Sequence, residues 1–171
     1  MGKTKDLRRV SYVSNLRSDS AEGAFLKELY KKVYDNSFNY DDMDSRIMLQ
    51  KAVYLIENMG VNVGDYSFSW DKYGPYSLAL DYDSERCSKT SERAVTFSGY
   101  AEECINRLKS YVCNKEAYSC KCWVEYIAAL HYLRVVYHLD DVQIIEELKR
   151  RKPYLDNYAA NQKALSIAKI I

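Results

Sequence analysis

Apolar residues recur at helical spacing along most of the chain. Phe25, Leu29 and Val33 repeat every four residues and predict a helix over residues 20–35. A second helix is predicted over 44–59, where apolar positions follow the i, i+3, i+4, i+7 pattern. In both segments the apolar side chains share one face, as expected of helices that cover a core.

The second half of the sequence is also predicted to be helical. Segment 119–138 is apolar on nearly every face, which is typical of the central helix of a bundle. Helices over 99–113 and 140–152 each carry a single apolar stripe, and Asp140 is placed to cap the latter. Pro153 then interrupts the pattern, and a final helix follows it.

Two short segments have the pattern of strands. Aromatic residues alternate with serines over 66–70, the period of a half-buried strand, and a second apolar run covers 94–97. We expect the two to pair antiparallel as a small wing.

The Gly-Pro step between these segments is predicted to open a helix over 75–84. Proline fits the first helical position, because its missing N–H would have no partner there. In this helix Leu78 and Tyr82 would face the core.

These elements predict a mainly α, single-domain helical bundle with a small two-stranded antiparallel β ribbon and a winged-helix-like part. A length of 171 residues suits one core. We expect a flexible basic arm over 1–19 and a helical domain over 20–171. The N-terminus has no apolar signal segment and no apolar run is long enough to span a bilayer, so we expect a cytoplasmic protein.

The cysteines and histidines do not form a recognisable metal site. Cys120, Cys122, His131 and His138 do not match zinc-finger spacing, and the two cysteines point in different directions on a helix. The odd number of cysteines, five, favours reduced thiols. Neither histidine lies near a nucleophile in sequence, and no phosphate loop is present. We therefore expect no metal, no cofactor and no enzymatic activity.

The charge balance bears on nucleic-acid binding. The net charge is only +1, so no field from the whole protein would attract nucleic acid. Helix 75–84 carries two aspartates, which would repel phosphates. A winged-helix-like nucleic-acid-binding protein is the alternative interpretation, and its contacts would come from the arm and the end of helix 140–152. The candidate residues are Arg8, Arg9, Lys149, Arg150, Arg151 and Lys152.

Taken together, several segments resemble one family, the Panacea domain of SocA-like antitoxins and their stand-alone or phage-associated bacterial relatives. The segments are LQKAVYL at 49–55, FSWDKYGPYS at 68–77, VTFSG at 95–99, WVEYIAALHYL at 123–133 and the Lys152-Pro153 step. The resemblance covers about residues 20–170. It implies a mainly helical, non-enzymatic, cytoplasmic protein that binds other proteins.

The resemblance makes a protein-binding regulator the leading hypothesis, either antitoxin-like within a toxin–antitoxin system or associated with phage defence. The partner would be another protein, such as a toxin or a phage or host factor. Tyrosine is abundant, with 17 residues, and is enriched at protein interfaces. We expect the partner-binding face to include Lys72, Tyr73 and Tyr76, which lie around the Gly-Pro step.

Overall fold

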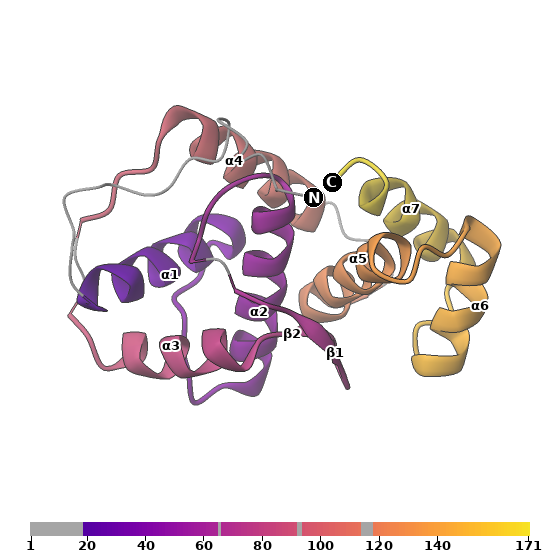
Figure 1. Cartoon of the computed structure of the whole chain (residues 1–171), viewed down its shortest axis with the longest axis horizontal. Helices are drawn as coiled ribbons and strands as arrows, with labels where there is room; N and C mark the ends of the chain where they lie inside the picture. Colours follow the sequence, from indigo (N-terminus) through magenta and orange to yellow (C-terminus); the bar gives the residue numbers. More distant parts are fainter. Residues whose placement is uncertain (1–18, 65, 92–93, 114–117) are drawn as a thin grey trace, which may run out of the picture.

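The structure is a computed structural model that describes residues 19–64, 66–91, 94–113 and 118–171. These residues form seven helices and two short strands (Figure 1). The helices are α1 (Asp19–Tyr34), α2 (Met43–Asn58), α3 (Leu78–Ser88), α4 (Gly99–Cys113), α5 (Cys120–Val135), α6 (Asp141–Arg151) and α7 (Tyr158–Ala168). The strands are β1 (Ser69–Asp71) and β2 (Gly74–Tyr76).

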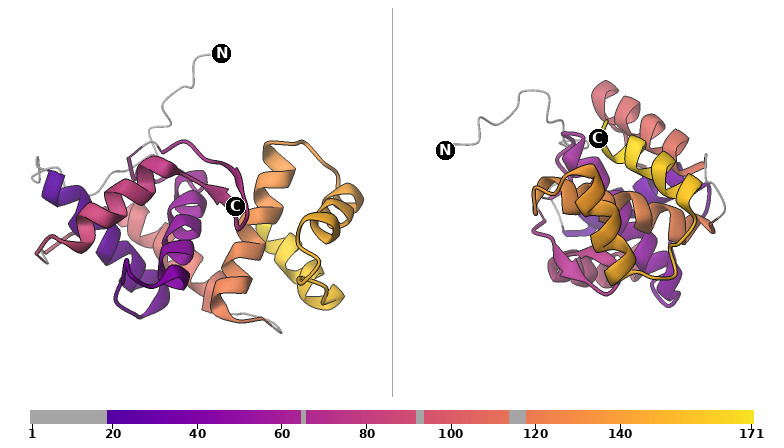
Figure 2. Two further views of the ribbon diagram at one scale, coloured as in Figure 1. Left: turned by 90° about the horizontal axis from the view of Figure 1, so that it is seen from below. Right: turned by 90° about the vertical axis from the view of Figure 1, so that its right-hand side faces the viewer.

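The mainly helical fold with a small antiparallel ribbon is confirmed. Helix α5 lies between two groups of elements: α2 and β2 pack on one side of it, and α6 and α7 on the other (Figures 1 and 2). Helix α2 in turn contacts α1, α3 and α4. None of the helices within the described ranges is both long and apolar enough to cross a bilayer.

Helix α5 occupies the centre, as its sequence predicts. Every residue from Trp123 to Leu133 is buried. The ring of Trp123 is fully covered, and its indole N–H donates a hydrogen bond to the carbonyl of Tyr111 at 2.9 Å. The buried run includes two polar residues, Glu125 and His131, which need partners inside the protein.

The ribbon is built from different segments than those expected, so the prediction of a wing is wrong. β1 pairs antiparallel with β2, with Trp70 opposite Pro75, and the segment 94–97 forms no strand. Phe97 instead packs its ring against Phe25, with centroids 4.9 Å apart. Both strands therefore precede α3, and no winged-helix arrangement is present in the described part of the protein.

Pro75 lies in β2 and does not start a helix. It has no N–H to give to the ladder, and its carbonyl accepts a hydrogen bond from the side chain of Lys51 at 2.7 Å. Helix α3 begins three residues later, after the N-cap Ser77. This later start changes the buried face: Leu80 and Ser84 face the core.

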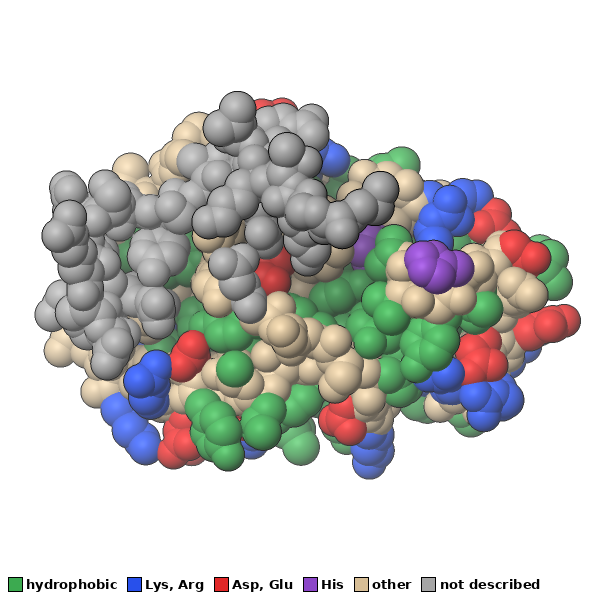
Figure 3. All heavy atoms as spheres, in the orientation of Figure 1, with side chains coloured by type: hydrophobic (Ala, Val, Ile, Leu, Met, Phe, Trp, Pro, Cys, Tyr) green, Lys and Arg blue, Asp and Glu red, His purple; other side chains and the backbone are tan. Residues whose placement is uncertain are grey.

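The prediction that Leu78 and Tyr82 face inward is accordingly wrong. They are 56% and 60% exposed. Hydrophobic side chains gather over α3 at the lower edge of the face drawn in Figure 3.

Other local signals are correct to within a residue or two. Asp140 caps α6 in a full capping box with Gln143. Helix α2 is capped by Asp42 and begins at Met43, one residue before the predicted start at 44. The predicted basic arm, with Arg8 and Arg9, lies outside the described residues except for residue 19, which is the first residue of α1.

Candidate functional site

The β1–β2 hairpin lies against the central helix. Gly74 follows the two-residue turn with a φ of +89°, a conformation that glycine adopts without steric cost. A Cβ at this position would lie 3.6 Å from the Cβ of Ala129 in α5, so the turn also approaches that helix closely. The second strand of the hairpin thus packs against α5, and it also contacts α2.

One buried lysine holds the turn from the C-terminal part of the protein. Lys152 is 1% exposed, and its ammonium donates a hydrogen bond to the carbonyl of Lys72 at 2.8 Å. The same ammonium forms a short ion pair with Glu125, which is equally buried. The hydroxyl of Tyr154 donates to the same carboxylate at 2.6 Å, and burial raises the pKa of this tyrosine. Glu125 therefore has two partners, as a buried carboxylate requires.

A second set of contacts holds the hairpin from α2. Lys51 donates a hydrogen bond to the carbonyl of Pro75. The side-chain amide of Gln50 donates to the carbonyl of Ser77 and accepts from the N–H of Ser77, at 2.9 Å each. Ser77 also caps α3 by accepting from the N–H of Leu80. Because all these partners are buried, the hairpin and the start of α3 have a fixed position relative to α2.

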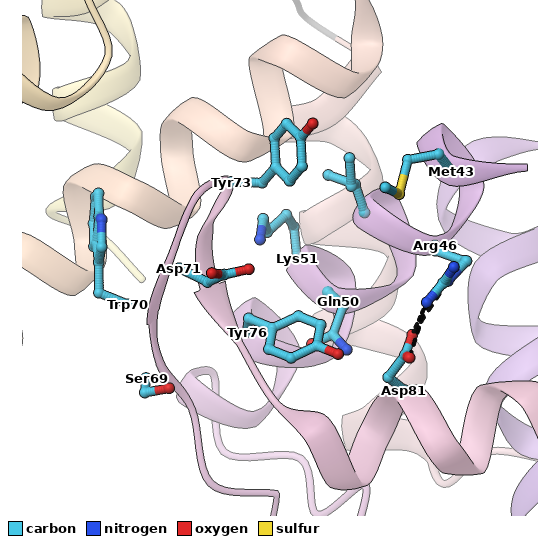
Figure 4. A pocket seen from close by; sticks show the side chains of 11 residues that line it. Met43, Arg46, Gln50, Lys51, Ser69, Trp70, Asp71, Tyr73, Tyr76 and Asp81 are labelled. Atoms are coloured by element: carbon cyan, nitrogen blue, oxygen red, sulfur yellow. Dashed lines mark hydrogen bonds and ion pairs between the residues drawn. The ribbon is translucent and has the colours of Figure 1, made fainter.

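A pocket of about 350 Å³ lies between α2, the hairpin and the start of α3 (Figure 4). It is lined by Met43, Arg46, Ile47, Gln50, Lys51, Ser69, Trp70, Asp71, Tyr73, Tyr76 and Asp81. Its wall therefore combines apolar, aromatic and charged groups, which is the usual make-up of a binding site.

Two of the charged groups in the pocket neutralise each other. The guanidinium of Arg46 binds both carboxylate oxygens of Asp81, with contacts of 2.9 to 3.2 Å (Figure 4). The same guanidinium lies 4.4 Å from the ring centroid of Tyr40. This bidentate pair leaves Arg46 with little capacity for another anion.

Lys51, unlike Arg46, has no ion-pair partner among the described residues, and its pKa is lowered. Burial lowers the pKa of its amine to about 7, and the nearby charge of Lys152 acts in the same direction. The carboxylates of Glu125 and Asp71 act in the opposite direction and only partly compensate. At neutral pH this amine is therefore close to half protonated.

The predicted partner-binding residues lie at this pocket. Tyr73 and Tyr76 line it, both half-buried, and burial raises the pKa of Tyr76. Lys72 is exposed outside the lining, with its ammonium 5.3 Å from the ring centroid of Tyr73. The ammonium of Lys121 lies 5.7 Å from the same ring. The structure brings the three predicted residues together, with Lys72 at the edge.

The basic residues at the end of α6 differ in their exposure. Lys152 is buried, so its assignment as a nucleic-acid contact is wrong. Arg151 lies 4.6 Å from the ring centroid of Trp70 and is paired with Glu147, which also binds Arg150. Lys149 and Arg150 remain exposed.

His131, the histidine in α5, is buried and hydrogen-bonded to a neighbouring helix. Nδ1 of His131 lies 2.8 Å from the hydroxyl of Tyr54, and burial lowers the pKa of His131 to about 4. The imidazole is therefore neutral at physiological pH and links α5 to α2. Cys120 and Cys122 are half-buried thiols, and no cluster of potential metal ligands occurs in the described ranges.

The sequence prediction missed Gln50, Lys51 and Glu125, which organise the pocket. A signal was present: Gln50 and Lys51 lie within the apolar stretch of α2, and Glu125 lies within that of α5. A charge on the buried side of such a helix needs a partner from elsewhere in the fold. No local pattern identifies that partner, because it lies far away in sequence.

Comparison of the protein with family models, curated proteins and solved structures gives no match. The pocket and its surroundings are therefore the structural basis for assigning a function.

Proposed function

We propose that this protein is a non-enzymatic protein-binding regulator, antitoxin-like or associated with phage defence, that recognises its partner through the hairpin pocket. The main support is the pocket itself, which joins Tyr73, Tyr76 and Met43 on a hairpin and helix held by buried hydrogen bonds. The antitoxin-like role comes from the resemblance of the sequence to the Panacea domain.

The fixed position of the hairpin favours binding. Its turn and second strand are held by Lys152 and Lys51, so little conformational entropy is lost when a partner settles on it. Tyr73 and Tyr76 offer aromatic surface with only two side-chain torsions each, together with hydroxyls that can hydrogen-bond. Such residues are frequent among those that dominate binding energy.

The size of the pocket suits an anchor from a protein partner. A volume of about 350 Å³ holds one or two side chains, and the rest of an interface would spread over the surrounding surface. Exposed Leu78 and Tyr82 on the neighbouring helix α3 would extend the apolar contact area.

The test is capture of partners from the native host. The bait proteins are the wild type and the double variant Tyr73→Ala, Tyr76→Ala, with folding checked by circular dichroism. We expect a protein retained by the wild type to be lost, or retained at least about tenfold less, with the double variant.

The variant Tyr158→Ala, at an exposed tyrosine of α7 outside the pocket and outside the contact area proposed above, is the control. It should keep the partner. Equal retention by all three baits would contradict the assignment of the pocket. Tight, salt-sensitive retention of DNA, with no protein lost from the variant, would support nucleic-acid binding instead.

A further inference from the structure

The two buried lysines near the hairpin differ in one respect. Both are 1% exposed and both donate to a hairpin carbonyl. Lys152 is also paired with the carboxylate of Glu125. Lys51, which lines the pocket, forms no ion pair with any carboxylate of the described residues.

A buried ammonium without a counter-ion is unfavourable. Burial of a charge costs free energy unless an opposite charge and hydrogen bonds compensate it. The Pro75 carbonyl satisfies one of the three donors of the ammonium. No other hydrogen bond from this ammonium to the described residues is formed, and Lys51 is one of the residues that line the pocket.

The other charges around Lys51 do not fill this role. Glu125 of α5 is engaged by Lys152 and Tyr154, and Asp71 of β1 is exposed and outside ion-pair distance. Asp81 is held by Arg46. A single carboxylate that entered the pocket would therefore give Lys51 the counter-ion that its neighbours do not supply.

We propose that the pocket binds a single carboxylate of a protein partner, which pairs with the ammonium of Lys51 while an adjacent apolar side chain packs against Met43 and Ile47. This inference rests on the proposed function and names the chemistry that the site recognises. The carboxylate comes either from an Asp or Glu side chain or from the free C-terminus of the partner. In both cases the occupant is an acidic group beside an apolar one.

The lining carries Arg46 and Lys51 against Asp71 and Asp81, so its formal charges sum to zero when Lys51 is protonated. Arg46 and Asp81 are paired with each other, and repulsion from Asp71 grows with the charge of the occupant, so a single carboxylate is favoured over a more highly charged group such as a phosphate. The apolar part of the lining favours an occupant with a hydrocarbon portion.

Binding should couple to protonation. The pKa of Lys51 is lowered to about 7 by burial, and a carboxylate beside it would raise that pKa. Above pH 7 binding of the carboxylate must therefore be accompanied by uptake of a proton from solvent by Lys51. Affinity should fall about tenfold between about pH 6 and about pH 8, because the protonated fraction of the free protein falls by that factor.

The test uses small probes in pairs that differ in charge. N-acetyl-leucine mimics a C-terminus, and N-acetyl-leucinamide is its neutral control. The α-amide of N-acetylglutamate mimics an internal acidic residue, and the corresponding glutamine compound is its control. Binding is measured by NMR titration of backbone amides, and proton uptake by calorimetry in buffers of different ionisation enthalpy.

We expect at least one acid to shift resonances of the hairpin and α2 and to bind at least about tenfold more tightly than its amide. Which acid binds identifies the source of the carboxylate. Lys51→Met should abolish both this preference and the proton uptake. Lys89→Met, at an exposed lysine of the α3 C-cap, is the matched control and should change neither.

A second variant keeps the test decisive if Lys51→Met does not fold. Asp71→Asn removes the negative charge at the pocket and should strengthen binding of the acid about threefold at about pH 6, where Lys51 is mostly protonated. Equal binding of acid and amide, or weaker binding by Asp71→Asn, would overturn the proposal. If the acids do not bind but the Tyr73, Tyr76 double variant still loses its partner, the proposed function stands and this inference fails.

Discussion

The ammonium of Lys152 donates a hydrogen bond to the backbone carbonyl of Lys72, 2.8 Å away and 80 residues earlier in the sequence. The same ammonium carries the ion pair to Glu125 of the central helix. One side chain therefore joins the segment after α6, the helix α5 and the turn of the hairpin. The ammonium and the carboxylate are both buried, which makes the lysine important for stability as well as for the shape of the pocket.

Lys152→Met should destabilise the protein by about 3–5 kcal/mol, because it leaves the carboxylate of Glu125 buried without its cation. Urea denaturation followed by circular dichroism measures the change. The double variant Glu125→Gln, Lys152→Met removes both charges and should regain a substantial part of the loss. A single variant within about 0.5 kcal/mol of the wild type would show that the pair has no such role.

Trp123→Ala should cost about 3–5 kcal/mol, the usual range for removing a large buried ring. The ring is fully covered at the start of α5, and its N–H is bonded to Tyr111. Tyr158→Ala, which truncates an exposed ring on α7, is the control and should change stability by less than about 0.5 kcal/mol. Thermal unfolding of the three proteins gives the comparison, and similar melting temperatures would refute the central position of Trp123.

Gly74→Ala should cost about 1–2 kcal/mol, because a residue with a Cβ is strained at a φ of +89°. The added methyl group itself meets Ala129 only at ordinary contact distance, so backbone strain is the main cause. Gly99→Ala is the matched control, since a Cβ there meets nothing within 4 Å and the φ is not positive. Denaturant midpoints that move equally in both variants would contradict the strained turn.

The low pKa of Lys51 predicts a pH dependence of folding. The unfolded protein holds this proton up to the ordinary lysine value of 10.5, whereas the folded protein releases it near pH 7 because the amine is buried. Between these values the unfolded state binds more protons, so this group makes stability rise with pH from about 7 towards about 10.

Lys51→Met should remove that contribution. The difference in unfolding free energy between wild type and variant, measured by urea denaturation at several pH values, should change in favour of the wild type as pH rises through this window. A difference that is constant with pH would show that Lys51 has an ordinary pKa in the folded protein. Lys89→Met, at an exposed lysine, provides the baseline for loss of a lysine elsewhere.

Regular helices could be predicted from the sequence because their signals are local. The unbroken apolar run of α5 identified the central helix, and Asp140 marked the start of α6. These patterns depend on residues within a few positions of each other. Tyr73 and Tyr76 could likewise be associated with one another, since they flank the same Gly-Pro step.

The hairpin could not be predicted in the same way. The alternation over 66–70 overlaps β1 only at its first two residues, and β2 has three residues, too few for a period to be recognised. The Gly-Pro step in β2 is equally compatible with the start of a helix. What decides its structure are Lys51 and Lys152, which bond Pro75 and Lys72 from 24 and 80 residues away. The pocket depends on the same distant contacts, so Gln50, Lys51 and Glu125 were not recognised as parts of a site.

The contact between Lys152 and Lys72 also has a consequence for biosynthesis. A ribosome makes α2 and the hairpin early, but the side chain that fixes the turn is added only at residue 152. Until that residue has emerged, the nascent polypeptide has the tyrosines of the pocket without the lysine that holds the turn beside them. The pocket is therefore completed only after residue 152 has been synthesised, 80 residues after the turn that it holds.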